Sequence, residues 1–163
     1  MRHDRPDPNL GPPVQRHDSL PMNVEVTSDP ARHDIDAIHD FLTRAYWSVG
    51  IPRETVARAV RNSLSFSLFV DSHPVGFARL VTDRATFAYL ADVYILESHR
   101  GQGLGSRLMD AVVAHPDVQG LRRWLLATRD AHGLYEKFGF APLPNPERFM
   151  EINRPDIYRA PVG

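Results

Sequence analysis

The segment from Leu90 to Ser106 constrains the fold of this chain more than any other part of the sequence. It begins with the apolar, aromatic and β-branched residues of a buried strand and continues through Gly101, Gly103 and Gly105 into helical spacing. Glycine allows backbone conformations that are closed to other residues, and it has no Cβ atom to obstruct a ligand. Successive N–H groups of such a turn point into one concavity at the positive end of the helix dipole. The segment therefore predicts a strand, a phosphate-binding turn and a helix, in that order.

Strand and helix patterns alternate along the rest of the chain. The expected strands cover residues 23–27, 65–71, 75–82, 86–96, 123–128 and, as a closing strand, 149–152. The expected helices cover residues 30 to about 46, 52–60, 103–114 and 130–138. Asp29 is the expected N-cap of the first helix, with Pro30 at its first position, and Asp130 is the expected N-cap of the last. This order predicts an α/β fold, with a mixed sheet and helices on both of its faces.

The two ends of the chain lack this periodicity. Residues 1–21 are rich in Pro, Asp, His and Arg, which predicts a disordered leader. We expect one folded domain over residues 22–153 and a tail over 154–163. Met22 directly precedes the first expected strand, so translation starting there is a second hypothesis for the native chain.

Composition excludes several classes of function. The net charge is -1, from 19 basic and 20 acidic residues, so neither nucleic acid nor an acidic membrane is an expected partner. The absence of cysteine excludes disulfides, thiolate metal sites and a cysteine nucleophile, and it fits a cytoplasmic protein. No apolar run reaches the roughly 20 residues that span a bilayer. The eight histidines are scattered, with no pair at helical metal-ligand spacing, and we expect no metal.

Two common phosphate-binding turns do not fit the glycine-rich segment. The ATP-binding P-loop requires a lysine after its last glycine, and none follows here. The dinucleotide-binding turn requires a third glycine where Ser106 stands, and it usually lies near the start of a domain. The remaining alternative to a phosphate site is a turn that only tightens the corner between strand and helix.

The sequence resembles the GNAT superfamily of acyl-CoA-dependent N-acyltransferases. The pyrophosphate loop of that family, Arg/Gln-x-x-Gly-x-Gly/Ala, corresponds here to Arg100, Gly103 and Gly105. A second family signature, a short helix with Tyr-x-x-x-Gly-Phe, begins here at Tyr135. The two signatures occur in the order and at the separation of the family, and the resemblance covers residues 22–152.

The resemblance implies a strongly twisted mixed sheet of about six to seven strands, in which the fourth and fifth strands splay apart. Acetyl-CoA would lie in that gap as the acyl donor. The backbone of Val93 and Ile95 would pair with its pantetheine amides as if it were another strand. The N–H groups from Gly101 through Gln102 to Ser106 would hold its pyrophosphate.

Acetyl transfer by direct attack requires a base for the amine proton and an acid for the departing thiolate. Tyr135 matches the tyrosine of the family and is the expected acid, because a phenol is protonated at neutral pH. The alternative is an aromatic residue that only packs the last helix against the sheet.

Asp92 is the expected base. It is a carboxylate in an otherwise apolar strand, where it must be hydrogen-bonded, ionised beside a cavity, or shifted toward neutrality. The alternation of strand side chains places it on one face with Leu90 and Tyr94, opposite Val93 and Ile95. The alternative is a structural carboxylate that bonds a neighbouring loop.

Three more residues complete the expected site. Thr128 stands where members of the family often have an asparagine that binds the cofactor, and its shorter side chain puts that contact in doubt. Tyr46 and Trp47 lie at the break between the first two helices and are expected to wall an apolar pocket for the acceptor, unless they only cap the core. No acidic cluster suggests a polycationic acceptor, so we expect a primary amine of a small molecule or of a peptide or protein.

Two other functions remain open at this level. The first is a CoA-binding sensor or scaffold without turnover, against which Tyr135 and Asp92 argue only weakly. The second is a nucleotide-binding domain of another fold, which the missing lysine and the tyrosine helix oppose more firmly. Members of the family often pair through sheet edges or late strands, so a homodimer is a further hypothesis that the sequence does not decide.

Overall fold

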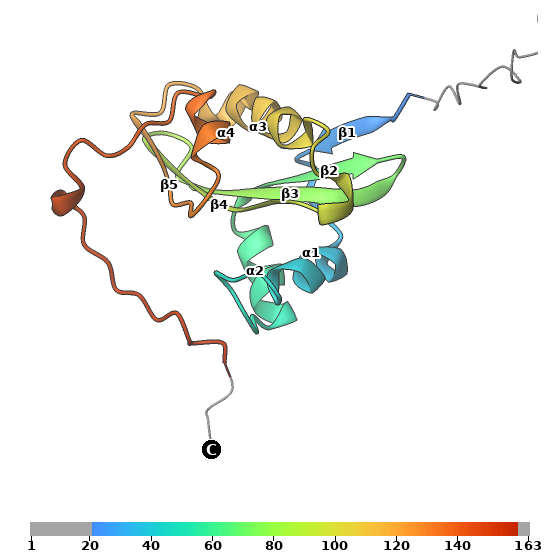
Figure 1. Cartoon of the computed structure of the whole chain (residues 1–163), viewed down its shortest axis with the longest axis horizontal. Helices are drawn as coiled ribbons and strands as arrows, with labels where there is room; N and C mark the ends of the chain where they lie inside the picture. Colours follow the sequence, from blue (N-terminus) through green and yellow to red (C-terminus); the bar gives the residue numbers. More distant parts are fainter. Residues whose placement is uncertain (1–20, 160–163) are drawn as a thin grey trace, which may run out of the picture.

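The computed structural model describes residues 21–159, so the leader expected over residues 1–21 lies outside the described residues except for Pro21. Five strands form one sheet in the order β1-β2-β3-β4-β5 (Figure 1). The strands are β1 (Val24–Thr27), β2 (Leu64–Val70), β3 (His73–Thr82), β4 (Phe87–Ile95) and β5 (Arg123–Leu126). The α-helices are α1 (Ile35–Leu42), α2 (Arg53–Arg61), α3 (Leu104–Ala114) and α4 (His132–Glu136).

The sheet is mixed and splayed. Neighbouring strands from β1 to β4 are antiparallel, whereas β4 and β5 are parallel. The pairing of β4 with β5 covers only residues 87–90 and 123–126, although β4 continues to Ile95. The whole of β5 therefore pairs with the first part of β4 only, and the second half of β4 has a free edge on this side.

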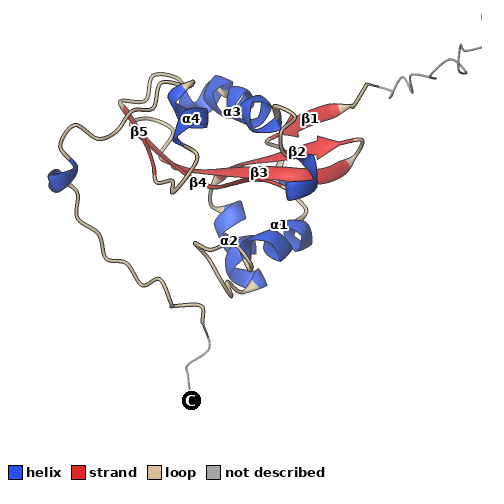
Figure 2. Ribbon diagram, in the orientation of Figure 1, coloured by secondary structure: helices blue, strands red, loops and turns tan. Residues whose placement is uncertain are grey.

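The helices cover both faces of the sheet, as predicted. Figures 1 and 2 show α1 and α2 below the sheet and α3 and α4 above it. On one face, Leu104, Leu108, Met109 and Val112 of α3 are buried in a core with residues of β2, β3 and β4. On the other face, a second core consists of Ile38, Leu42, Ile51, Val56, Val60, Phe77 and Tyr94. Burying apolar side chains on both faces stabilises the central strands.

A β-bulge in β4 changes which side chains share a face. Phe77 pairs with Tyr94 and Arg79 pairs with Ala91, so β4 has one more residue than β3 between these two pairs. Asp92 lies in this bulge with a positive φ of 54°. The extra residue inverts the alternation of side chains along the strand. The prediction that Asp92 and Tyr94 share a face with Leu90 is therefore wrong, because Leu90 packs in the α3 core and Tyr94 in the α1–α2 core.

The first helix begins later than predicted. Asp29 caps only a 3-10 turn, Pro30–Arg32, and accepts the N–H of Ala31 at 3.0 Å. His33 is extended, and Asp34 then caps α1 by accepting the N–H of Ala37 at 3.0 Å. Two aspartates within six residues offer competing start signals, and the apolar face that packs against the sheet begins only after the second.

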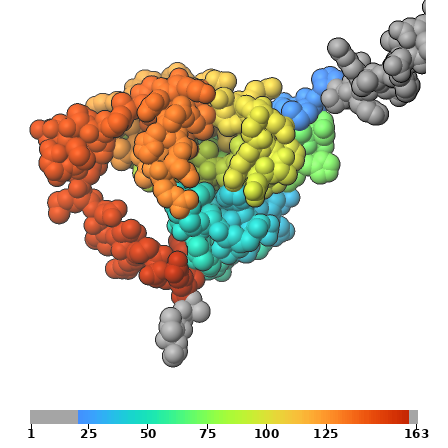
Figure 3. Space-filling view, viewed as in Figure 1, coloured from blue at the N-terminus to red at the C-terminus, as the bar shows by residue number. Residues whose placement is uncertain are grey.

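The closing strand predicted over residues 149–152 is wrong. This segment is extended but makes no strand pair, so the described sheet has five strands rather than six to seven. Prolines at 142, 144 and 146 fix φ and remove N–H donors, which favours a chain that continues past β5 rather than reversing to pair with it. Figure 3 shows the tail leaving the body of the molecule, with an opening between them, before its end returns to the body, where the backbone of Tyr158 lies against Gly50.

Between residues 21 and 159, no helix combines the length and apolar character needed to cross a membrane.

Candidate functional site

A cleft of about 500 Å³ opens where β4 loses its β5 neighbour. The end of β4, the glycine-rich turn, the start of α4 and the segment that follows α1 surround it. Its lining residues are Phe41, Ala45, Tyr46, Trp47, Val93, Tyr94, Ile95, His99, Arg100, Gly101, Gly103, Leu104, Gly105, Arg129, Asp130, Ala131, Leu134 and Tyr135. The cleft therefore collects most of the site residues predicted from the sequence, from segments far apart in the chain.

The glycine-rich turn presents free backbone donors to this cleft. Gly101 and Gly103 have positive φ values of 75° and 73°, and no heavy atom lies within 4 Å of the position that a Cβ would take on either. α3 starts directly after Gly103, whose carbonyl accepts the N–H of Arg107 at 3.2 Å. Within the described part of the chain, no N–H from Gly101 to Ser106 has a protein acceptor. Six consecutive donors at the positive end of a helix form a site for an anion.

Arg100 lies beside these donors and also contacts β4. Its Nε donates to the carbonyl of Ile95 at 3.0 Å, and its side chain is exposed at the edge of the cleft. Both Val93 and Ile95 line the cleft and are partly buried, while the pairing of their backbone with pantetheine amides stays a prediction. The bond from Arg100 fixes the last carbonyl of the free β4 edge.

Tyr135 lies on α4 and lines the cleft together with Leu134, whose side chain packs against Gly105 of the glycine turn. Phe140 donates its N–H to the carbonyl of Tyr135 at 3.2 Å, and Gly139 donates to Glu136 at 3.1 Å with a φ of 91°. This pair of bonds is a Schellman motif, which requires the glycine. The ring of Phe140 meets that of Tyr135 edge-on at 5.9 Å. The Tyr-x-x-x-Gly-Phe pattern thus ends the helix and fixes the tyrosine ring at once.

The hydroxyl of Tyr135 has no hydrogen-bond partner among residues 21–159, although the residue is only 8% exposed. Burial, followed by the nearby Tyr46 and Asp130, raises the pKa of Tyr135 to about 12. The phenol is therefore protonated throughout the neutral range and has a free donor in the cleft.

Aromatic side chains form the wall of the cleft on the α1 side. Phe41 stacks on Tyr94 with ring centres 3.8 Å apart, and Trp47 meets Tyr46 edge-on at 5.0 Å. The guanidinium of Arg129 lies over the ring of Tyr46, 3.9 Å from its centre. This cation–π contact joins the segment after β5 to the segment after α1 across the cleft. Tyr46 and Trp47 both line the cleft, and their role as the wall of an acceptor pocket stays a prediction.

Asp92 does not line the cleft. Its Oδ2 accepts Nε of Arg79 at 2.8 Å, and its Oδ1 accepts Nε1 of Trp47 at 3.0 Å. Both oxygens are therefore engaged, and the bulge directs the carboxylate toward the α1–α2 face. This arrangement matches the structural alternative given by the sequence, while the role of a base for Asp92 stays a prediction.

Thr128 lies outside the cleft and has a local role. Its hydroxyl accepts the N–H of Ala131 at 3.0 Å, which fixes the turn before α4. The prediction that Asp130 caps this helix is wrong, because the N-cap residue is Ala131 and its own N–H bonds to Thr128 instead. Of the remaining predicted cofactor residues, Gln102 and Ser106 also lie outside the cleft lining, and their backbone N–H groups have no acceptor among residues 21–159.

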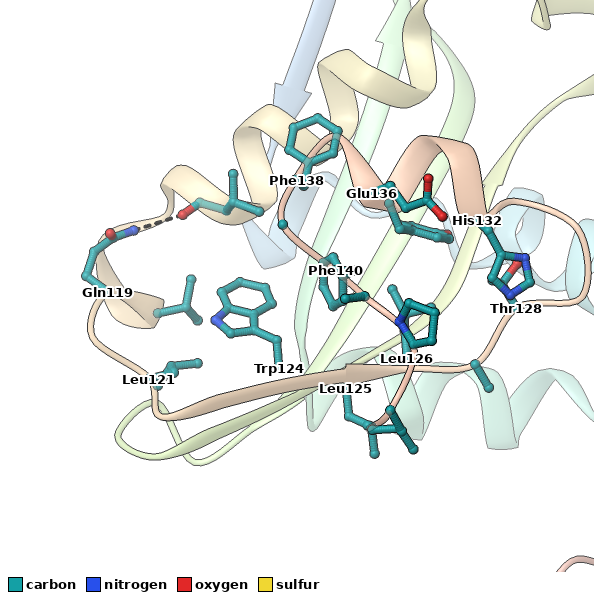
Figure 4. Close-up of a pocket in the computed structure, with 18 of the residues that line it drawn as sticks. Gln119, Leu121, Trp124, Leu125, Leu126, Thr128, His132, Glu136, Phe138 and Phe140 are labelled. Atoms are coloured by element: carbon teal, nitrogen blue, oxygen red, sulfur yellow. Dashed lines mark hydrogen bonds between the residues drawn. The ribbon is translucent and has the colours of Figure 1, made fainter. Parts of the chain in front are cut away.

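A second cavity of about 670 Å³ lies on the other side of Tyr135, along the free edge of β5 (Figure 4). Trp124 and Phe140 point into it from opposite sides, with ring centres 6.4 Å apart. Thr128 and His132 also line this cavity, and Tyr135 is common to both.

Nine residues that line the cleft were not among the site residues predicted from the sequence: Phe41, Ala45, Tyr94, His99, Leu104, Arg129, Asp130, Ala131 and Leu134. The position of His99 beside the glycine turn was a signal in the sequence that could have identified it as a cleft residue. Its Nδ1 shares a hydrogen bond with the hydroxyl of Ser98 at 2.8 Å. Arg129 carried no local signal, because its partner Tyr46 is distant in the sequence. Among the described residues, no group of three or more His, Asp or Glu side chains is placed to hold a metal ion.

Comparison with known proteins identifies the family. The acetyltransferase (GNAT) family matches residues 32–140, which is more than half of the chain. A Gibberella zeae protein whose name assigns it as an acetyltransferase is 32% identical over 135 residues, covering 69% of this chain and 75% of that protein.

Solved structures agree with this match. A GNAT-family protein from Xanthomonas campestris pv. campestris is 50% identical, with a TM-score of 0.82 over 85% of this chain and 98% of that one. A Clostridium acetobutylicum protein described as an acetyltransferase, solved with acetyl-CoA, is 16% identical, with a TM-score of 0.58 over 81% and 96% of the two chains; it shows likeness of fold. The chain with this cleft belongs to the GNAT acetyltransferase family.

Proposed function

We propose that this protein transfers an acetyl group from acetyl-CoA to a primary amine of a small molecule, peptide or protein, by direct attack in a ternary complex. One observation carries the proposal. The free N–H groups at the start of α3 and the free hydroxyl of Tyr135 belong to the same cleft, at the point where β4 and β5 separate. An anion site and a proton donor in one cleft suit a phosphate-bearing thioester.

The glycine turn fits a pyrophosphate. Space is open where Cβ atoms would lie on Gly101 and Gly103, the donors up to Ser106 are free, and Arg100 adds a positive charge. The free edge of β4 near Val93 supplies backbone groups for the pantetheine amides. Acetyl-CoA, when bound, supplies the activated acyl group.

Tyr135 would donate a hydrogen bond to the sulfur that leaves. With a pKa of about 12 the phenol is a weaker acid than a thiol, whose pKa is about 8.5, so full proton transfer to the thiolate is unfavourable. A hydrogen bond that strengthens as charge develops on sulfur still stabilises the transition state.

The acceptor amine would approach along the aromatic wall, next to Tyr46 and Trp47. It must lose a proton as it attacks the thioester carbonyl. The sequence assigned that proton to Asp92; the engaged carboxylate supports another role, argued below.

Calorimetric titration with acetyl-CoA tests the cofactor site. We expect micromolar binding to the unmodified protein and its loss in Gly103→Asp, because a carboxylate there repels the pyrophosphate. Gly120→Asp is the matched control: Gly120 also has a φ of 75° and open space at its Cβ, and it lies outside the cleft. Equal loss of binding in both variants would reject the assignment of the loop.

Thiol release tests turnover separately. A panel of primary amines should release free CoA with the unmodified protein and release little with Tyr135→Phe. Binding of acetyl-CoA without thiol release for any amine would favour the alternative of a CoA-binding sensor or scaffold.

A further inference from the structure

A buried ion pair connects β3 and β4 beside the cleft. The bond between Nε of Arg79 and Oδ2 of Asp92 is 2.8 Å long, and the two side chains are only 18% and 12% exposed. Every other ion pair of residues 21–159 has side chains at least 43% exposed. A buried charge needs its partner, because removing one member leaves the other unpaired in a poorly solvated place.

Two further hydrogen bonds extend this pair to neighbouring elements. Nη1 of Arg79 donates to the hydroxyl of Ser63 at 3.2 Å, just after α2. Nε1 of Trp47 donates to the free oxygen of Asp92 at 3.0 Å. The carboxylate therefore lies between a guanidinium on the sheet and an indole on the segment between α1 and α2.

Trp47 depends on this contact for its orientation. It is 42% exposed and lies in a segment of turns rather than in a helix or strand. Its ring centre lies 6.2 Å from that of Phe41, in a tilted contact, and 5.0 Å from that of Tyr46, in an edge-on contact, and neither contact involves the indole N–H as a hydrogen-bond donor. The bond to Asp92 is its polar anchor, so the position of the indole in the cleft depends on the ion pair.

We propose that Asp92 is a positioning residue, which with Arg79 holds the indole of Trp47 as a fixed wall for the acceptor. This inference rests on the proposed function. It also names the acceptor class: a primary amine carried on an apolar or aromatic body. Among residues 21–159, Asp130 is the only carboxylate that lines the cleft, and its Oδ2 lies 3.6 Å from Nη2 of Arg129, so a second positive charge on the acceptor would compete with that guanidinium.

Fluorescence tests the positioning without any turnover. The chain has two tryptophans, so a Trp124→Phe background leaves Trp47 as the only reporter. In that background, Asp92→Ala should shift the emission of Trp47 to longer wavelength and increase its quenching by acrylamide, because the indole is released to water. Asp40→Asn is the matched control: it breaks another Asp–Arg pair, exposed on α1, and should change neither signal.

Kinetics test the acceptor class. With 2-phenylethylamine as the probe, Asp92→Ala and Trp47→Ala should each raise KM about fivefold to tenfold, the usual worth of an aromatic contact. With ethylamine, which is too small to use the wall, KM should change less than twofold, as should the Kd for acetyl-CoA. Trp47→Phe keeps an aromatic ring and the ion pair but loses the N–H that bonds to Asp92. It should give the same rise in KM for 2-phenylethylamine, and it tests the proposal even if Asp92→Ala fails to fold.

Two results would overturn the proposal. One is a fall in kcat for both amines at unchanged KM, with loss of the acidic limb of the pH–rate profile, which assigns Asp92 as the base. The other is unchanged emission and quenching of Trp47 in Asp92→Ala. Should the unmodified protein neither bind acetyl-CoA nor release thiol, the proposed function fails, and the fluorescence of Trp47 still decides the positioning.

Discussion

Leu90 and Tyr94 lie on the same strand, yet their side chains are buried in different cores on opposite faces of the sheet. The bulge between them causes this. Asp92 takes a left-handed conformation with a φ of 54°, and the strand gains one residue relative to β3. The bulge thereby turns Val93 and Ile95 toward the cleft side while Tyr94 supports the aromatic wall.

The left-handed backbone at Asp92 predicts an unusual order of stabilities. Asp92→Gly and Asp92→Ala both remove the ion pair, but only alanine keeps a Cβ in the left-handed region. We expect the glycine variant to be more stable by up to about 1 kcal/mol. Urea unfolding measures the difference. At Asp110, exposed within α3, the same two substitutions should show the opposite order, since glycine costs about 1 kcal/mol in a helix. A glycine penalty at both positions would contradict the bulge.

The raised pKa of Tyr135 predicts the shape of the pH–rate profile. A donor with a pKa of about 12 stays protonated to high pH, so kcat should show no basic limb from this group below about pH 10. Tyr135→Phe should lower kcat by roughly 100-fold or more at all these pH values. Tyr158→Phe, in the exposed tail, is the control and should leave kcat unchanged. A basic limb between pH 8 and 10 that disappears in Tyr135→Phe is the result that this prediction forbids.

The same group adds a dependence of stability on pH. Its folded pKa is raised above the ordinary value of 10, so the folded state holds the proton more tightly than the unfolded chain. This contribution is complete below pH 10 and is lost as pH rises through about 12. The unfolding free energy of the unmodified protein should therefore fall relative to that of Tyr135→Phe as pH rises from 10 to about 12, as urea unfolding of both proteins at each pH would measure.

Gly76 couples the packing of β3 to the cleft. A Cβ at this position would lie 2.6 Å from Cδ1 of Ile95, 3.1 Å from the carbonyl oxygen of Tyr94 and 3.3 Å from Cβ of Leu68. We expect Gly76→Ala to lower the free energy of unfolding by about 1–3 kcal/mol and to weaken acetyl-CoA binding, because Ile95 must move into the cleft. Gly133→Ala, in α4 with open space at its Cβ, should be neutral or stabilising by up to about 1 kcal/mol. Denaturation and calorimetry of the two variants test both halves of the prediction.

The sequence predicted the parts of the site that are contiguous in the chain. The turn around Gly103 and the helix that carries Tyr135 are local patterns, and each folds as its residue spacing indicates. It did not predict the surroundings of Asp92, because the bulge depends on pairing with β3 and the bond to Trp47 spans 45 residues. It likewise had no signal for Arg129, which meets Tyr46 only after the chain has folded.

The exposed tail bears on the homodimer that the sequence left open. Met150 is 97% exposed and Ile152 is 91% exposed. They are two residues apart on a segment that pairs with no strand of the described sheet. The outer edge of β5 is also unpaired within the described residues, and a cavity lined in part by Trp124 and Phe140 follows it. Exposed apolar side chains and a free sheet edge are complementary surfaces for a second copy of the chain.

We therefore expect self-association through this segment. Light scattering after gel filtration should give about twice the chain mass of 18.4 kDa, and the double variant Met150→Glu, Ile152→Glu should return it to the mass of one chain. Neither side chain contacts a core of its own chain, so the variant should keep the unfolding transition of the monomer. Val81→Glu, which places the same charge at a 45% exposed position on β3, should leave the mass unchanged. The variant should dissociate because a glutamate buried against Trp124 and Phe140 of the second copy has no partner there. A monomer of unmodified protein at high micromolar concentration, or a dimer that survives the double variant, would therefore exclude the tail as the contact.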